Sequence, residues 1–279
     1  MTIAITGSTG HLGRLAVAAL QARVPATDII ALARDPAKAA DLGVAVRAFD
    51  YGNADPDALK GVDTLVLISS SSLEDRVGDH KRVIAAAKTA GVGRVIYTSI
   101  LKGHASPMKL ADDHKATETA LEQSGLTTTI LRNGWYTENY TGSLAASVEH
   151  GALIGSAGAG LLSTAPRADY AAAIAVVAST DGHDGKVYEL AGDRAYTMAE
   201  MASEVSKVTG KTIPYNSLPE DVYAGILQGF GLPEVLARIL ADSDVQATHG
   251  ALFDDSKTLS RLIGRPTTPM ADTVKATLA

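Results

Sequence analysis

The chain has 279 residues, of which 46% are hydrophobic, and its formal net charge is -6 at neutral pH. This length suffices for one sizeable core or for a large domain with a smaller one, while the lack of any Lys/Arg-rich run disfavours nucleic-acid binding. The absence of cysteine excludes disulfides, thiolate metal sites and a cysteine nucleophile. No apolar run reaches the length of a membrane span, so we expect a cytoplasmic protein that does not enter a membrane.

Short apolar runs alternate with helical patterns over the first 132 residues. Six of these runs are expected to form strands, at residues 2–6, 28–33, 44–49, 63–69, 93–99 and 126–132. The helical patterns between them lie at residues 11–22, 36–42, 74–90 and 109–124. Such alternation is typical of a parallel sheet joined by right-handed crossovers. We therefore predict an α/β fold of the Rossmann type, with helices on both faces of the sheet.

The alternation loosens after Arg132. Helices are expected at residues 137–149, 168–179, 198–209 and 219–242 (one or two) and in the tail, with one strand at 186–192. Residues 151–166 are rich in Gly and Ser, which indicates a loop with room for one short strand. We predict a nucleotide-binding domain over residues 1–150, with 166–190 packing on it. Residues 151–165 and 191–279 would then form a smaller α/β cap that binds the substrate.

The motif TGSTGHLG, at residues 6–13, follows the first predicted strand and opens the first predicted helix. One glycine allows a tight turn, the next lets the backbone approach a pyrophosphate, and the third lets the helix pack on the sheet. The N–H groups of the helix start favour an anion. In this context the motif predicts a dinucleotide site, although a glycine-rich turn without a ligand is the alternative. The candidate residues are Thr6, Gly7, Ser8, Thr9, Gly10, His11, Leu12 and Gly13.

Arg34 stands at the end of the second predicted strand, followed by Asp35. Proteins that bind NAD usually carry an acidic residue at this end, which bonds the ribose hydroxyls. A guanidinium instead suits the 2′-phosphate of NADP(H), so NADPH is the expected cofactor. If Asp35 faced the ribose in its place, NAD could be used.

Two further places fit the nucleotide interpretation. Asp50, after the third predicted strand, could reach the adenine amino group. Ser69, Ser70 and Ser71 follow the fourth strand, where a cofactor would cross the carboxyl edge of the sheet. An ordinary flexible loop is the alternative for these serines.

The chain resembles the NmrA-like group of atypical short-chain dehydrogenases/reductases, and within it the quinone and triphenylmethane-dye reductases. The resemblance runs over nearly the whole chain. It is carried by the segments TGSTGHLG, ALARDP, AFDYGN, LVLISSSS, GVGRVIYTS, LADDHKATE, LRNGWYTENY and ALFDDSKTLSRLIGRPTTP. His11 stands where such enzymes often have Gln, a departure at the pyrophosphate turn that should not change the chemistry.

The resemblance implies that the residues after the sixth predicted strand help to line an NADPH site. These residues are Asn133, Gly134, Trp135, Tyr136, Thr137 and Glu138. Their position fits this role, because ligands of open α/β sheets bind outside the carboxyl ends of the strands. Trp135 and Tyr136 could wall a nicotinamide and a flat acceptor. The alternative for Trp135 is an anchor in the core.

The tyrosine and lysine that many related reductases carry four residues apart are absent, because none of the nine tyrosines has Lys four residues later. In LADDHKATE, His114 takes the place of the tyrosine and Glu118 that of the lysine. His114 is therefore a candidate catalytic proton donor, since its ordinary pKa suits proton transfer near neutral pH. Glu118, one turn further along the helix, could orient it. A structural histidine is the alternative.

These observations favour an NADPH-dependent reductase that transfers a hydride directly to a quinone, without flavin or metal. A quinone needs no strong acid, since its reduced form is a stabilised phenolate. Two alternatives stay open, namely a reductase of triphenylmethane or azo dyes and a non-catalytic regulator that senses NADP(H). The expected partner is a small quinone-like molecule and no nucleic acid, and the sequence leaves open whether the chain forms a homodimer.

Overall fold

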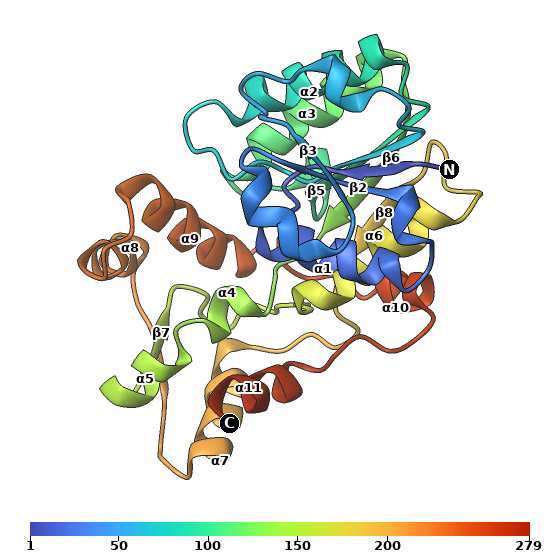
Figure 1. The fold of residues 1–279 in the computed structure, drawn as a ribbon. Helices are drawn as coiled ribbons and strands as arrows, with labels where there is room; N and C mark the ends of the chain where they lie inside the picture. Colours follow the sequence, from blue (N-terminus) through green and yellow to red (C-terminus); the bar gives the residue numbers. More distant parts are fainter. The chain divides into compact units, whose positions relative to one another are not determined.

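The computed structural model describes residues 1–279 and contains a seven-stranded sheet of order β3-β2-β1-β4-β5-β6-β8 (Figure 1). Its strands are β1 (Ile3–Ile5), β2 (Ile29–Ala33), β3 (Ala45–Ala48), β4 (Thr64–Leu67), β5 (Arg94–Ile100), β6 (Thr127–Asn133) and β8 (Val187–Leu190). The pairs from β3 to β6 are parallel. The predicted Rossmann-type sheet is thereby confirmed.

Two helices cover each face of this sheet, as Figure 1 shows. Helices α2 (Arg76–Ala90) and α3 (Ala111–Ser124) lie on one face, and α1 (His11–Gln21) and α6 (Arg167–Ser179) lie on the other. The central strands β1, β2 and β4 are buried along their whole length. That is why their sequences are nearly continuous apolar runs with no alternation. Short 3-10 helices occupy Ala26–Asp28, Pro36–Leu42, Pro56–Leu59 and Gly103–Ala105.

The chain divides into two compact units. Unit 1 comprises Met1–Gly103, Asp113–Asn133 and Arg167–Tyr188, and it contains most of the large sheet. Unit 2 comprises His104–Asp112, Gly134–Pro166 and Glu189–Ala279. Compared with the expected boundaries, residues 104–112 and 134–150 pack with the second unit.

Unit 2 is largely helical. Its helices are α4 (Glu138–Thr141), α5 (Leu144–His150), α7 (Met198–Thr209), α8 (Glu220–Gly229), α9 (Glu234–Ala247), α10 (Thr258–Ile263) and α11 (Met270–Leu278). Its two short strands, β7 (Leu153–Gly155) and β9 (Tyr215–Ser217), pair in parallel. The capping box predicted at Thr197 and Glu200 is present at the start of α7. None of the helices of the chain is both long and apolar enough to span a membrane.

Three expected elements differ in detail. Residues 36–42 form a 3-10 helix in place of an α-helix, closed at Gly43 by a left-handed backbone. The helix expected at 137–149 is split at Gly142 and Ser143 into α4 and α5. The region 219–242 contains two helices, α8 and the start of α9, separated by a turn at Gly231 with φ of 90°.

Candidate functional site

The glycine turn lies between β1 and α1. Gly7 has φ of 60°, a backbone conformation that glycine adopts without strain. The amide of Gly10 donates to the carbonyl of Gly7 at 2.9 Å, which closes the turn. A Cβ on Gly13 would lie 2.1 Å from the Gly7 oxygen, so the helix packs directly against the turn. The structure thus shows the tight turn at Gly7 and the close helix packing at Gly13 that the motif predicts.

The N-terminus of α1 fits an anionic group. Gly10 is the N-cap and supplies no side-chain cap, and the first turn of α1 carries no acidic residue. The first N–H groups of a helix lack partners within the helix, and the helix dipole adds partial positive charge there. A pyrophosphate would satisfy both features. The turn is therefore suited to a dinucleotide.

The other residues of the motif separate into buried and exposed ones. The hydroxyl of Thr6 donates to the carbonyl of Val66 at 3.2 Å, and that of Ser8 donates to the carbonyl of Leu32 at 2.9 Å. These two side chains are fully buried and hold the turn on β4 and β2, so neither side chain is available to a cofactor. Leu12 is also buried, whereas Thr9 is half-buried and His11 is exposed.

Arg34 lies exposed at the end of β2, and its guanidinium forms no hydrogen bond or ion pair within the chain. Asp35 has a local structural role, because its carboxylate accepts from the amide of Ala37 at 3.1 Å and caps the following 3-10 helix. This arrangement favours Arg34 over Asp35 as the residue that meets the ribose. Asp50 is exposed and accepts from the amide of Gly52 at 3.0 Å in a tight turn.

The serine loop, residues Ser69–Ser72, follows β4 and is held by buried partners. The amide of Ser69 donates to the hydroxyl of Thr98 at 2.9 Å, and the amide of Ser70 donates to Nε2 of His80 at 2.8 Å. Arg76 donates through Nε to the carbonyl of Ser70 at 2.8 Å. The first part of the loop is therefore anchored, while Ser71 is exposed.

The sheet order brings these segments to one place. Strands β1 and β4 are neighbours at the point where the strand order of the sheet reverses direction. The glycine turn and the serine loop therefore follow adjacent strands. Arg34 follows β2, which pairs with β1 on the side opposite to β4. In open parallel sheets, ligands bind at the carboxyl ends of the strands around such a reversal. The candidate residues of unit 1 thus meet where a cofactor is expected.

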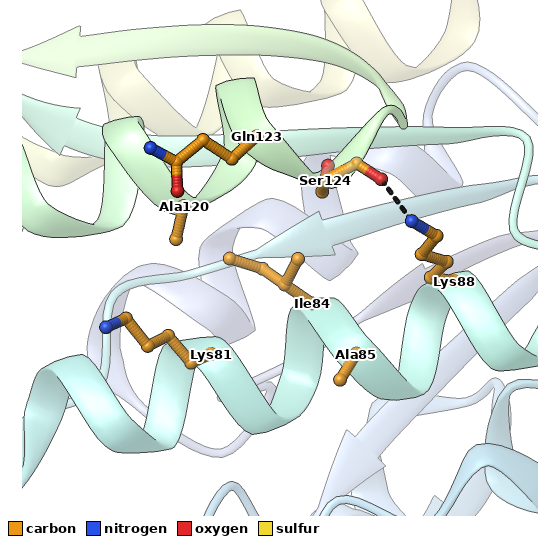
Figure 2. A pocket seen from close by; sticks show the side chains of 7 residues that line it. All are labelled: Lys81, Ile84, Ala85, Lys88, Ala120, Gln123 and Ser124. Atoms are coloured by element: carbon orange, nitrogen blue, oxygen red, sulfur yellow. Dashed lines mark hydrogen bonds between the residues drawn. The ribbon is translucent and has the colours of Figure 1, made fainter.

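A shallow groove lies at the other end of the sheet, and Figure 2 shows it between α2 and α3. It is lined by Lys81, Ile84, Ala85, Lys88, Ala120, Gln123 and Ser124. These residues extend to the C-terminal ends of both helices, which lead into the amino ends of the next strands. One wall is closed by Lys88, whose Nζ donates to the carbonyl of Ser124 at 2.8 Å. The groove is therefore remote from the carboxyl edge.

The segment after β6 contributes candidates to both units. Asn133 ends β6 in unit 1, where it is buried and its carbonyl accepts from the amide of Leu101 at 2.9 Å. In unit 2, Gly134 and Trp135 are buried, and the burial of Trp135 supports its role as a packing anchor. Thr137 is also buried, whereas Tyr136 and Glu138 are partly exposed and remain candidates for a ligand contact.

His114, on α3, is buried and bonds to Tyr97 on β5, with 2.8 Å between Nδ1 and the hydroxyl oxygen. Burial, together with the charge of Arg76 and the proximity of His80, lowers the pKa of His114 to about 3. The imidazole is therefore neutral at physiological pH. The expected role as an ionised donor with an ordinary pKa does not fit this environment.

Glu118 binds Arg132 and does not serve as the partner of His114 Nδ1. Its two oxygens lie 3.0 Å from Nε and 2.6 Å from a terminal nitrogen of Arg132, and Ser99 donates to it at 2.5 Å. Sequence reasoning missed Tyr97, because a tyrosine inside an apolar strand run gives no local signal of a polar role. It also missed His80, because in the sequence this residue is one of several scattered histidines with no spacing that marks a site.

The two buried histidines predict acid-sensitive stability. Burial and Arg76 lower the pKa of His80 to about 3, as for His114, so both take up protons on unfolding below pH about 6.5. The free energy of unfolding should therefore fall as pH drops from about 6.5 to about 3, by up to about 1.4 kcal/mol per pH unit for each histidine. Denaturant titrations between pH 7 and pH 4 would measure this slope.

One buried carboxyl opposes this trend. Asp244, on α9, accepts from the hydroxyl of Tyr140 at 2.9 Å and from the amide of Ser156 at 2.8 Å, and burial raises its pKa to about 6. The folded chain thus binds the extra proton between the ordinary value of 3.8 and about 6, and this contribution to stability is lost as pH rises. Asp244→Asn should therefore steepen the acid slope. A wild-type stability that is flat from pH 7 to pH 4 would contradict the assignment of neutral histidines.

Comparison with known proteins gives consistent matches over the full chain. A model of the NmrA-like family matches residues 1–262. Quinone oxidoreductase 2 of Escherichia coli K12 is 53% identical over 277 residues, covering 98% of this chain and 97% of that protein. The crystal structure of an NADPH-dependent quinone oxidoreductase from Escherichia coli, complexed with NADPH, superposes with a TM-score of 0.97 at 52% identity and covers both chains fully. The triphenylmethane reductase of Citrobacter sp., complexed with NADP(H), has a TM-score of 0.93 at 35% identity, covering 99% of this chain and 100% of that one.

Proposed function

The chain belongs to the NmrA-like family, and on this premise we propose that it is an NADPH-dependent reductase that transfers a hydride directly to quinones. The observation that carries the proposal is the 53% identity, over nearly the full length of both chains, to an enzyme named quinone oxidoreductase 2. The glycine turn and the uncapped start of α1 support it independently, because they suit the pyrophosphate of a dinucleotide.

NADPH would be held at the carboxyl edge of the large sheet. The backbone of the glycine turn would meet the pyrophosphate, and Arg34 would bind the 2′-phosphate as a bidentate donor. The serine loop would follow the cofactor across β4. When bound, NADPH supplies the hydride, and the chain supplies orientation and exclusion of water.

Quinone chemistry fits the groups that this chain offers. A quinone that accepts a hydride becomes a hydroquinone anion, which takes one proton from water to give the hydroquinone. The step needs no side-chain acid, and the neutral state of His114 is compatible with it. We propose that neither flavin nor metal takes part in this reaction. Reduction of triphenylmethane dyes is a second candidate activity, favoured by the 35% identity to the Citrobacter enzyme.

The test of this proposal is the oxidation of NADPH by the purified protein with and without a quinone. A simple benzoquinone or naphthoquinone should accelerate oxidation, and NADPH should outperform NADH. A triphenylmethane dye in place of the quinone tests the second candidate activity. If NADPH binds and neither acceptor accelerates its oxidation, the enzyme proposal fails, and a regulator that senses NADP(H) becomes the better explanation.

The substitution Arg34→Ala tests the contact with the 2′-phosphate of the cofactor. Loss of a charge-assisted contact costs about 1.5–3 kcal/mol, so the KM for NADPH should rise by roughly 10- to 100-fold. The KM for NADH should stay unchanged, because NADH has no 2′-phosphate. An equal preference for both cofactors in wild type and variant would remove Arg34 from the site.

A further inference from the structure

The pairing of His114 with Tyr97 determines which ring nitrogen carries the proton. Both residues belong to unit 1, and Tyr97 is fully buried on β5. Nδ1 of His114 is occupied by the Tyr97 hydroxyl at 2.8 Å, whereas Nε2 forms no hydrogen bond within the chain. His114 keeps 7% of its surface exposed. Nε2 is therefore the atom left for a ligand.

The proton positions around Tyr97 follow from a chain of hydrogen bonds. The amide of Ser70 donates to Nε2 of His80, so the proton of the neutral His80 ring is on Nδ1. That N–H points at Thr117 Oγ1, which lies 2.9 Å away and accepts it. The Thr117 hydroxyl donates its own proton to the carbonyl of Asp113 at 2.8 Å. The Thr117 oxygen thus accepts a hydrogen bond from His80, and its own proton is used by the Asp113 carbonyl.

The bond between Tyr97 and His114 has a preferred direction. A phenol, with an ordinary pKa of about 10, is the better donor, and a neutral imidazole nitrogen, whose acid has a pKa of about 6.5, is the better acceptor. Thr117 and Ser69 also interact with the Tyr97 hydroxyl, but an imidazole nitrogen is a stronger acceptor than a hydroxyl oxygen. The Tyr97 hydroxyl therefore donates to Nδ1, and His114 carries its proton on Nε2. The ionised form, with a proton on both nitrogens, is disfavoured by burial and by the nearby Arg76.

We propose that His114 acts on the acceptor as a neutral hydrogen-bond donor through Nε2–H, and that Tyr97 is the positioning residue that fixes this tautomer. The proposal deepens the quinone reductase function and rests on it. It also changes the role expected from the sequence, because His114 would stabilise charge without giving up its proton. Neutral imidazoles act as electrophiles of this kind where their surroundings disfavour the ionised ring.

The proposed step balances without a protein acid. As the hydride arrives, one quinone oxygen gains negative charge, and a preorganised N–H donor stabilises it. Water then protonates the hydroquinone anion, and His114 ends the cycle as it began it.

The charged and titratable groups around the ring are consistent with this role. Arg76, paired with Asp113 at 2.9 Å, faces it from α2, and His80 faces it from the same helix. Glu118 lies one turn along α3 and is neutralised by Arg132. Turnover should therefore show no titration near pH 6.5.

The experiment is nitrogen NMR of the full-length protein labelled with ¹⁵N-histidine, with His114→Gln used to assign the signal. His114 should show a protonated Nε2 and an unprotonated Nδ1 that accepts a hydrogen bond, unchanged between pH 5 and pH 8. A proton on Nδ1, or an ionised ring at pH 6, would overturn the proposal. This readout does not depend on turnover, so it remains decisive even if no quinone is reduced and the functional proposal fails.

Tyr97→Phe tests the positioning role. Without the hydroxyl, the His114 signal should become a mixture of both tautomers, and kcat for quinone reduction should fall by roughly tenfold, the value of one hydrogen bond. The KM for NADPH should stay unchanged. Wild-type turnover with a midpoint near pH 6.5, or an unchanged kcat when the tautomer has changed, would overturn the proposal.

Tyr188→Phe is the matched control for this substitution. Its hydroxyl also lies 2.8 Å from a histidine Nδ1, that of His183, and the pair is remote from the carboxyl edge of β5. This variant should leave both the His114 signal and kcat as they are in wild type. A fall in kcat equal to that of Tyr97→Phe would show that the loss of any such hydroxyl suffices, and it would overturn the specific role of Tyr97.

Discussion

Replacing Gly13 by alanine is expected to weaken NADPH binding by about 100-fold, as the loss of one or two charge-assisted hydrogen bonds to the pyrophosphate would. The added Cβ would lie 2.1 Å from the Gly7 carbonyl oxygen and 2.8 Å from the Ser8 Cα. Both contacts are to backbone, so the new methyl group cannot be accommodated by turning a side chain. Either α1 moves away from the turn or the turn opens, and each change displaces the N–H groups that would meet the pyrophosphate. Calorimetric titration with NADPH would measure the loss.

Gly225→Ala is the matched control for that experiment. Gly225 lies inside α8, and a Cβ there would meet no atom within 4 Å. Alanine should leave the affinity for NADPH unchanged and add about 0.5–1 kcal/mol of helix stability. If Gly13→Ala bound NADPH as tightly as wild type while remaining folded, the glycine turn would not be the nucleotide site.

The first unit could be predicted closely because its signals are local. Each buried strand is a short apolar run, each crossover helix has its own periodicity, and the glycine motif joins one strand to one helix. A Rossmann-type sheet has the strand order 3-2-1-4-5-6, which the first six strands of the large sheet show here. The positions of Arg34 and of the serine loop at one edge follow from that order and needed no further information.

The second unit shows where local signals end. Strand β9 was not expected, because YNS at residues 215–217 is short, polar and largely exposed. Its partner β7 lies some sixty residues earlier in the chain, so no pattern within one window links them. Residues 134–150 continue directly from β6, and the sequence therefore suggested that they belong to the first domain. They pack with α7 and α11, which lie far along the chain, and no periodic pattern in the sequence predicts such a contact.

The candidate site divides in the same way. Helical spacing correctly placed Glu118 one turn after His114, and yet it could not reveal the partners of either residue. Ser99 and Arg132 are paired across β5 and β6, so both reach Glu118 from the sheet beneath α3. Tyr97 reaches His114 from the same strand as Ser99. Cross-strand register thus decided the role of Glu118, and the packing of α3 on β5 decided that of His114. Neither is visible in the sequence of a single element.

Removing the charge of Glu118 should destabilise the protein by about 3–5 kcal/mol, the cost of breaking a buried ion pair. The side chains of Glu118 and Arg132 are only 3% and 19% exposed. In Glu118→Gln the new amide would accept at most part of the three hydrogen bonds and would turn a donor toward the guanidinium. Arg132 would then lose the carboxylate that pairs with it in a largely buried place. Thermal and denaturant unfolding would measure the loss.

Glu234→Gln provides the matched control, since Glu234 bonds Arg238 at 2.9 Å with both side chains more than half exposed. Exposed pairs contribute about 0–1 kcal/mol, so this variant should unfold nearly as wild type does. The double variant Glu118→Leu/Arg132→Met removes both buried charges and should recover part of the loss seen in Glu118→Gln, because an apolar pair leaves no unpaired charge. Equal losses in the buried and the exposed variant would mean that burial does not set the energy of the Glu118–Arg132 pair.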